Sequence, residues 1–237
     1  MSRQCRRRLD GGAGRFFLEE REFAMTTLRF DDLKQYSDVL RSRRGDPITV
    51  RFVEPRDAEE LQNYFRSLSS LARYNRFMGA MGELPKPVLD NFTHVSERDG
   101  FTVIATIQVD GFETIVGEAR YIFNPADGSF EFGLSIEDRW QGSGIGSALL
   151  KNLECRAAAF GAERLFGDTL RSNQSMIALA RKSGFAFARH PDDWKLVRFT
   201  KEIAVVPEEI PCASWRIAAQ NAALTSVGPR DHRRTSL

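Results

Sequence analysis

Glycines at alternate positions in one segment mark the clearest candidate for a ligand site. Residues 141–146 read Gln-Gly-Ser-Gly-Ile-Gly, after an alternating apolar stretch and before a stretch with its apolar residues on one helical face. Glycine lets backbone N–H groups approach a ligand closely. The first turn of a helix has unpaired N–H donors and a partial positive charge. Such a loop is suited to an anionic phosphate group.

Three kinds of phosphate loop compete for this pattern. The kinase-type P-loop requires Gly-Lys-Ser/Thr at the helix start, whereas Gly146 is followed by Ser147 and Ala148. The dinucleotide fingerprint requires G-x-G-x-x-G, which Gly142, Gly144 and Ser147 match poorly. The third pattern, Q/R-x-x-G-x-G/A, is matched at every defined position. It is the pyrophosphate loop of the GNAT acyltransferases, which this segment resembles.

Further segments extend the resemblance to GNAT enzymes. Residues 173–185, Asn-Gln-Ser-Met-Ile-Ala-Leu-Ala-Arg-Lys-Ser-Gly-Phe, resemble the second GNAT signature, an Asn that opens a helix ending in Gly-Phe. The likeness covers roughly residues 48–199. Residues 50–57 and 68–77 resemble the acetyltransferase domain of bacterial protein lysine acetyltransferases. Those enzymes often carry a regulatory nucleotide-binding or acyl-CoA-synthetase-like domain, for which we expect no room in 237 residues.

The resemblance implies where acetyl-CoA binds. It would lie in a wedge where the third strand of an antiparallel meander splays from the strand after the glycine loop. The pantetheine arm would hydrogen-bond along the splayed strand, and the pyrophosphate would take backbone N–H groups of the loop. Asn173 would lie near the thioester or the pantetheine arm. The residues expected to bind acetyl-CoA are Leu134, Ser135, Ile136, Gln141, Gly142, Ser143, Gly144, Ile145, Gly146, Ser147, Asn173 and Met176; no metal is expected.

The transfer of an acetyl group to an amine calls for a general base. An amine with a pKa near ~10 must lose a proton, and a carboxylate acting directly or through water is sufficient. Side chains alternate along a strand, so Glu131 and Gly133 face the same way, and Gly133 leaves room for a substrate. The lysine acetyltransferase resemblance also places the catalytic glutamate at Glu131. A solvated strand carboxylate is the other interpretation, and Glu118 and Asp138 are weaker alternatives for the base.

The resemblance also implies how the tetrahedral intermediate is stabilised. The developing oxyanion needs a preorganised N–H donor, which we expect at Leu134 of the splayed strand. Many GNAT enzymes have a Tyr after the Leu of the second signature, as the general acid for the leaving thiolate. Here Ala180 follows Leu179. The protein lysine acetyltransferases also tend to lack this Tyr, and a CoA thiolate (thiol pKa near ~8.5) is a tolerable leaving group without it.

The elements that must position these residues follow from periodicity. Apolar alternation and turn signals predict strands, and apolar residues at 3–4 residue spacing predict helices. The expected order βααβββαβαββ is an antiparallel meander followed by one βαβ crossover, so the fold class is α+β with a mixed sheet. The expected strands are residues 48–53, 101–109, 114–123, 129–136, 164–170, 185–188 and 194–199, and the expected helices are residues 61–71, 88–95, 145–160 and 174–182.

The expected domain is residues 47–200. Before it, residues 25–46 are expected to form a helical extension around Phe30–Leu40, and residues 1–24 to be disordered or over-called sequence before an alternative start at Met25. Residues 201–237 are expected to be a tail.

Composition limits the partners. Residues 1–24 hold six Arg and four acids, and residues 201–237 five basic residues and four acids, out of 34 and 32 in the chain. The remainder therefore carries 23 basic and 24 acidic side chains. This balance excludes nucleic-acid binding by charge, except through the N-terminal arginines. No apolar run approaches the ~18–20 residues that cross a bilayer. Three widely spaced cysteines argue against a disulfide framework or a zinc site and for a reducing compartment.

Together these features predict a cytoplasmic GNAT-fold N-acetyltransferase that moves an acetyl group from acetyl-CoA to an amine. The expected acceptor is a lysine side chain of a protein. The alternative within the enzyme class is a small-molecule amine acetyltransferase, which would need an acidic, enclosed acceptor pocket, whereas a protein substrate needs an open groove. A non-catalytic acyl-CoA-binding or sensing module is the alternative from another class.

Overall fold

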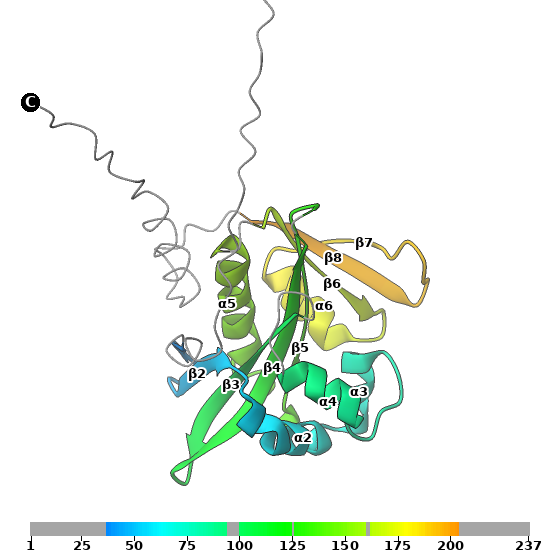
Figure 1. Cartoon of the computed structure of the whole chain (residues 1–237). Coiled ribbons are helices and arrows are strands. Elements are labelled where there is room, and N and C mark those ends of the chain that lie inside the picture. Colours follow the sequence, from blue (N-terminus) through cyan, green and yellow to red (C-terminus); the bar gives the residue numbers. More distant parts are fainter. Residues whose placement is uncertain (1–36, 94–99, 125, 160–161, 204–237) are drawn as a thin grey trace, which may run out of the picture.

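A mixed sheet with the strand order β1-β2-β3-β4-β5-β6-β8-β7 forms the centre of the protein (Figure 1). The computed structural model describes residues 37–93, 100–124, 126–159 and 162–203. Every described strand pair is antiparallel except β5–β6, which is parallel. The α+β fold with a meander and one crossover is thereby confirmed. The strands are β1 (Asp38–Arg41), β2 (Pro47–Phe52), β3 (Phe101–Val109), β4 (Phe112–Asn124), β5 (Ser129–Ile136), β6 (Arg164–Leu170), β7 (Ala186–Arg189) and β8 (Leu196–Glu202).

Helices cover both faces of the sheet. Figure 1 shows α5 on one side and α2, α3 and α4 on the other. Tyr64 of α2 reaches Ser135 of β5, whereas Arg156 of α5 lies over the ring of Phe52 on the opposite face. The helical elements are η1 (Pro55–Asp57), α2 (Ala58–Ser67), α3 (Ser70–Phe77), α4 (Lys86–Thr93), η2 (Asp138–Trp140), α5 (Ile145–Ala159) and α6 (Gln174–Lys182).

One helix expected over residues 61–71 is in fact two. Leu68 is extended (φ −62°, ψ 143°), and the Oγ of Ser69 accepts a hydrogen bond from the N–H of Ala72 at 3.1 Å. A serine that caps a new helix competes with the continuation of the previous one, which the apolar spacing does not reveal.

The N-terminal segment also differs from the expectation. Residues 38–41 form the strand β1 instead of a helix; residues 30–36 lie outside the described residues, as do 1–24 and 204–237. Asp38 is 3% exposed and accepts hydrogen bonds from Asn152 (2.8 Å) and Arg156 (3.2 Å) of α5. The local pattern of this polar segment favours a surface helix, because its buried partners lie more than a hundred residues away. The sheet therefore begins before the expected boundary at residue 47.

Cysteine usage differs from the expectation as well. Cys155 lies in α5 without exposed surface and is disulfide-bonded. The other two cysteines lie outside the described residues. Cys155 is thus an exception to the argument against disulfides, while the compartment stays a prediction. No helix in the described part of the chain has the length and apolar character needed to cross a membrane.

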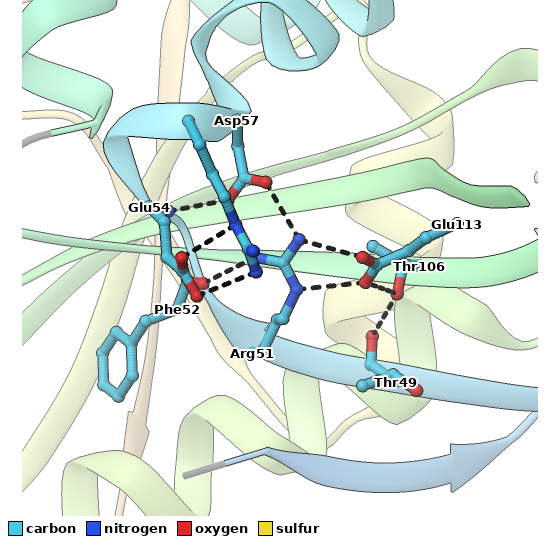
Figure 2. A network of polar contacts seen from close by, with 8 residues as sticks. Thr49, Arg51, Phe52, Glu54, Asp57, Thr106 and Glu113 are labelled. Carbon is cyan, nitrogen blue, oxygen red and sulfur yellow. Dashed lines mark hydrogen bonds and ion pairs between the residues drawn. The ribbon is translucent and has the colours of Figure 1, made fainter. Parts of the chain in front are cut away.

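Arg51 of β2 fixes the start of the helical layer to the sheet (Figure 2). Its guanidinium donates to both carboxylate oxygens of Asp57 (2.8 and 3.0 Å) and of Glu113 on β4 (3.0 and 3.1 Å). The hydrogen bonds from Arg51 hold the pKa of Glu113 below its ordinary 4.5. Burial alone would raise the pKa of Asp57, but hydrogen bonds from Arg51 and from the N–H of Glu54 lower it below its ordinary 3.8.

Acidification is expected to weaken the fold through these two carboxylates. A carboxylate whose pKa is lower in the folded than in the unfolded state stabilises the folded state above its unfolded pKa, and this stabilisation is lost as the pH falls through the folded pKa. The free energy of unfolding should therefore decrease below about pH 4.5. Arg51→Met should be less stable than the wild type near neutral pH and should lose less on acidification. Urea unfolding as a function of pH measures the stability near neutral pH and its loss on acidification. If the stability of the wild type and of Arg51→Met depends on pH in the same way, Asp57 and Glu113 do not cause the loss.

Candidate active site

The sheet opens between β5 and β6. The two strands pair only from Ser129–Glu131 to Arg164–Phe166, although both continue beyond this point. The N–H of Glu137 donates to the carbonyl of Val116 at 3.0 Å. Because hydrogen-bonded residues alternate in an antiparallel pair, the odd-numbered residues of β5 exchange their backbone bonds with β4. The backbone groups of Leu134 and Ile136 consequently face the gap.

The glycine loop lies between η2 and α5. Gly142 and Gly144 have φ values of +74° and +95°, which side chains rarely adopt. A Cβ on Gly144 would lie 2.7 Å from Cγ of Arg43, whose N–H donates to the carbonyl of Ser143 at 2.7 Å. The turn between β1 and β2 therefore rests on the loop. At Gly146 a Cβ would lie 3.3 Å from the side chain of Leu179 on α6, a tight contact that a small shift of this side chain would relieve.

The loop presents unpaired backbone donors. Five N–H groups of the loop donate no hydrogen bond to any described residue: those of Gly142, Gly144, Ile145, Gly146 and Ser147. They precede or belong to the first turn of α5, where the helix dipole is positive, so they form an anion site. The expectation also included the N–H groups of Gln141 and Ser143, which have partners within the loop. Gln141 and Ser143 donate to the carbonyls of Asp138 and Trp140, each at 3.3 Å, and hold the loop in shape.

A cavity of about 420 Å³ extends from this loop along the splayed strand. Ten of the twelve residues expected to bind the co-substrate line it. The two exceptions are Ser143 and Ile145, which are buried at 6% and 1% exposure. The cationic residues Arg43 and Lys182 also line the cavity. Neither residue was expected at this cavity, because each reaches it only through the fold. Arg43 comes from the turn between β1 and β2, and Lys182 from the end of α6.

A second cavity of about 450 Å³ lies next to the first. Its lining includes Glu131 and Gly133 of β5, Arg120 of β4 and Asp168 of β6. The two cavities have a common set of lining residues, and we call this set the junction: Asn75, Arg76, Leu134, Asn173 and Met176. A ligand in one cavity can therefore meet a ligand in the other at the junction.

Asn173 is fixed at the junction by its local structure. It caps α6, because its Oδ1 accepts the N–H of Met176 at 3.1 Å. Its Nδ2 donates to Oγ1 of Thr169 on β6 at 3.0 Å. Both polar ends of this side chain are thus used by the fold, which places Asn173 and Met176 beside the gap. Ala180, where many relatives carry a Tyr, has no exposed surface and lines neither cavity.

The three carboxylates considered as a base, and Asp168 of the second cavity, differ in whether they are already bound. Glu131 is exposed, lines the second cavity and forms no hydrogen bond or ion pair with the described residues. Asp138 accepts two hydrogen bonds from Ser69, each at 2.8 Å, and so fastens α3 to the turn before the glycine loop. Asp168 is bound by Arg198 at 2.7 and 2.9 Å. Glu118 is fully buried and lines neither cavity.

A buried polar chain supports the junction from below. Arg76 donates to both carboxylate oxygens of Glu118 (2.6 and 3.3 Å), Ser135 donates to Glu118 (2.8 Å), and Tyr64 shares a hydrogen bond with Ser135 (2.9 Å). Burial on its own would lower the pKa of Arg76, but the charge of Glu118 raises it. Burial and the same charge raise the pKa of Tyr64 well above 10. A Cβ on Gly133 would lie 2.9 Å from Nη1 of Arg76, so Arg76 takes the space expected for a substrate.

Breaking this chain is expected to cost substantial stability. Glu118→Gln leaves the buried guanidinium of Arg76 without a counter-charge, and breaking a buried pair costs about 3–5 kcal/mol. The unfolding midpoint should fall by roughly 6–20 °C at ~2–4 °C per kcal/mol. Thermal unfolding measures the shift. The double variant Arg76→Met/Glu118→Met should lose less stability than the sum of the losses in Arg76→Met and Glu118→Met. Additive losses would show that the two residues are not coupled.

The site combines a gap between parallel strands, an anion site at the mouth of that gap and two cavities that meet there. A protein with this arrangement can bring an acyl-CoA thioester to an acceptor. The chain belongs to the GNAT acetyltransferase family, whose model matches residues 64–185. This family carries out acyl-CoA-dependent N-acetyl transfer. In the described part of the chain, no group of three or more His, Cys, Asp or Glu could hold a metal ion.

Known proteins support this assignment. An acetyltransferase of Pseudomonas aeruginosa is 27% identical over 149 residues, which cover 63% of this chain and 80% of that protein. Among solved structures, the GNAT domain of S. lividans PAT superposes with a TM-score of 0.64 at 24% identity, covering 70% of this chain and 96% of that domain. Spermidine N-acetyltransferase from Vibrio cholerae, in complex with CoA and spermine, superposes with a TM-score of 0.55 at 15% identity. The superposition covers 66% of this chain and 96% of that chain. At these identities the structures show the fold.

Proposed function

We propose that this protein transfers the acetyl group of acetyl-CoA directly to the side-chain amine of a lysine on another protein. The observation that carries the proposal is the junction: a cavity that ends at an anion site meets a second cavity that contains the unpaired carboxylate of Glu131. Each cavity offers what one of two substrates needs, and their meeting point lies at the gap in the sheet.

The first cavity would hold acetyl-CoA, which supplies the thioester. The five unpaired N–H groups of the glycine loop would bind its pyrophosphate, with Arg43 and Lys182 as cationic neighbours. The pantetheine arm would hydrogen-bond along Leu134, Ser135 and Ile136. The carbonyl of Ile136 accepts a hydrogen bond from Nε2 of Gln141 at 3.1 Å, so the arm would compete with that amide or share the acceptor.

Glu131 would accept the proton that the amine loses as it attacks. Its position on the acceptor side, its exposure and the lack of an ion pair in the described structure leave it able to do so. The N–H of Leu134 faces the gap and would donate to the developing oxyanion. No tyrosine stands at position 180 to protonate the sulfur, so the thiolate would leave without that acid.

The second cavity favours a protein lysine over a polyamine. Its lining has two acids, Glu131 and Asp168, and two arginines, Arg76 and Arg120. Asp168 is paired with Arg198 and Arg76 with Glu118, so the lining has no surplus of acids. A polyamine carries several positive charges and would need a surplus of acids. The rim is partly apolar and exposed, with Met78 and Ile122 at 41% and 40% exposure. A single lysine on a protein surface fits such a rim.

Acetyl transfer to a lysine-containing peptide and to spermidine, at equal concentrations, tests the proposal. We expect a higher kcat/KM for the peptide. Faster turnover of spermidine would assign the protein to small-molecule acetylation. Stabilisation by acetyl-CoA without turnover of any amine would assign it to acyl-CoA sensing.

A further inference from the structure

The turn between β1 and β2 carries an arginine whose side chain lies against the glycine loop. The Cγ and Cδ atoms of Arg43 lie 2.7 and 3.4 Å from the position that a Cβ on Gly144 would take. The residue is exposed and lines the first cavity, and its guanidinium forms no hydrogen bond or ion pair with any described residue. Its charge is therefore available beside the unpaired N–H group of Gly144.

The backbone of this turn is fixed from two sides. Ser42 is 7% exposed, and its Oγ accepts the N–H groups of Arg44 and Asp46, each at 3.1 Å, and donates to the carboxylate of Asp46 at 3.0 Å. The N–H of Arg43 donates to the carbonyl of Ser143 at 2.7 Å, which joins the turn to the loop. A ligand at the loop would have to order only the side chain of Arg43, so little of the binding free energy is lost to ordering.

The charges that line the first cavity favour a ligand that carries phosphate. Arg76 is already paired with Glu118. The remaining charges of the lining are two cations, Arg43 and Lys182, against one acid, Asp138. Of the two cations, Arg43 is the one in contact with the loop. A planar guanidinium can donate two parallel hydrogen bonds to the oxygens of a phosphate. A thioester on pantetheine alone has no negative charge and would leave this group unused.

Nothing in the family pattern accounts for this residue. The family model matches residues 64–185, so the turn lies before the matched segment. We infer that Arg43 selects the acyl donor, an inference that rests on the proposed co-substrate. Its guanidinium binds the pyrophosphate of acetyl-CoA together with the N–H groups of the glycine loop. The protein thereby discriminates a CoA thioester from a pantetheine thioester that lacks phosphate.

The test compares binding of acetyl-CoA, of 3′-dephospho-acetyl-CoA, which keeps the pyrophosphate, and of S-acetylpantetheine, which has no phosphate. Arg43→Gln should raise the Kd of acetyl-CoA about 10- to 100-fold, the range for loss of a hydrogen bond to a charged group. The Kd of the 3′-dephospho compound should rise by the same factor, and that of S-acetylpantetheine should not change. The Kd of acetyl-CoA should also depend less on salt in the variant, because one exposed ion pair fewer is screened. Isothermal titration calorimetry measures all of these values.

Arg44→Gln is the matched control. Arg44 is the next residue of the same turn, is exposed and lines neither cavity, so this substitution removes the same charge without removing a contact. All three Kd values should stay at those of the wild type. The unfolding midpoint of ligand-free Arg43→Gln should also equal that of the wild type, because the guanidinium has no partner to lose in the described structure.

Four results would overturn the inference. An unchanged Kd of acetyl-CoA in Arg43→Gln would remove Arg43 from the site, and equal losses in Arg43→Gln and Arg44→Gln would show a general effect of charge. A loss for acetyl-CoA but not for the 3′-dephospho compound would assign Arg43 to the other phosphate. A lower midpoint in the ligand-free variant would show a structural role.

The proposed function fails by different results. Binding of acetyl-CoA by the wild type without transfer to any amine would remove the acetyl transfer and leave the role of Arg43 standing on the Kd values. Absence of acetyl-CoA binding by the wild type would remove both.

Discussion

Glu131→Gln is expected to lower kcat about 10²- to 10⁴-fold, the range typical for loss of a general base. Glutamine has nearly the same shape as glutamate but cannot take a proton from the amine. Glu131 forms no hydrogen bond or ion pair with the described residues, so the substitution leaves no partner behind. The unfolding midpoint and the Kd of acetyl-CoA should therefore remain at their wild-type values. Steady-state kinetics at saturating acetyl-CoA measures the loss.

Glu59→Gln is a matched control, since Glu59 is also exposed and forms no bond with the described residues, but lines neither cavity. It should keep full activity. If Glu131→Gln retains wild-type turnover, the base lies elsewhere. In that case Asp168 would have to be released from Arg198 before it could serve.

Gly144→Asp is expected to abolish acetyl-CoA binding. The φ of +95° strains any side chain, a Cβ would lie 2.7 Å from Arg43, and the new carboxylate would repel the pyrophosphate. Loss of two charge-assisted hydrogen bonds, at about 1.5–3 kcal/mol each, weakens binding by about a hundredfold or more. For the wild type, acetyl-CoA at about 100 times its Kd adds ~2.7 kcal/mol, or roughly 5–11 °C in the unfolding midpoint. The variant should show no such shift.

Gly82→Asp provides the matched control, because a Cβ added at Gly82 would meet no other atom within 4 Å and the residue lies outside both cavities. Its shift with acetyl-CoA should equal that of the wild type. A full shift in Gly144→Asp would mean that the loop does not bind the pyrophosphate. No shift in the wild type at millimolar acetyl-CoA would remove the co-substrate from the proposed function.

Much of the fold could be predicted from local sequence. Strands β3, β5 and β6 and helix α6 have the residue ranges that the patterns predict. These elements have strong local signals: Asp110-Gly111 turns the chain between β3 and β4, and Asn173 and Gly184 mark the ends of α6. The glycine loop is equally recognisable, because positive φ values favour glycine at positions 142 and 144.

The remainder depends on contacts between distant residues. β1 carries no apolar alternation of its own and is held through Asp38 to α5. Arg43 reaches the first cavity only because the turn after β1 rests on residue 143. Asn75 and Arg76 resemble their neighbours in a polar helix. Nothing in their spacing shows that Arg76 is paired with Glu118 or that the Oδ1 of Asn75 has no hydrogen-bond partner in the described structure.

The structure also explains the segments that resemble protein lysine acetyltransferases. Arg51 and Asp57, at the two ends of one such segment, form the network that anchors the helical layer to the sheet. Arg73 in the other segment ties α2 to the chain after α3. These residues build the scaffold, so the likeness at these positions supports a common fold more directly than a common acceptor.

The position of β1 shows that an independently folding fragment must include Asp38. A fragment cut at residue 47, where the local patterns place the domain boundary, would lack Asp38 and would leave Arg156 and Asn152 of α5 without its carboxylate in the protein interior. It would also expose the hydrogen-bonding edge of β2, which favours pairing between chains. Such a fragment should aggregate on expression, whereas the full chain should be recovered as folded protein.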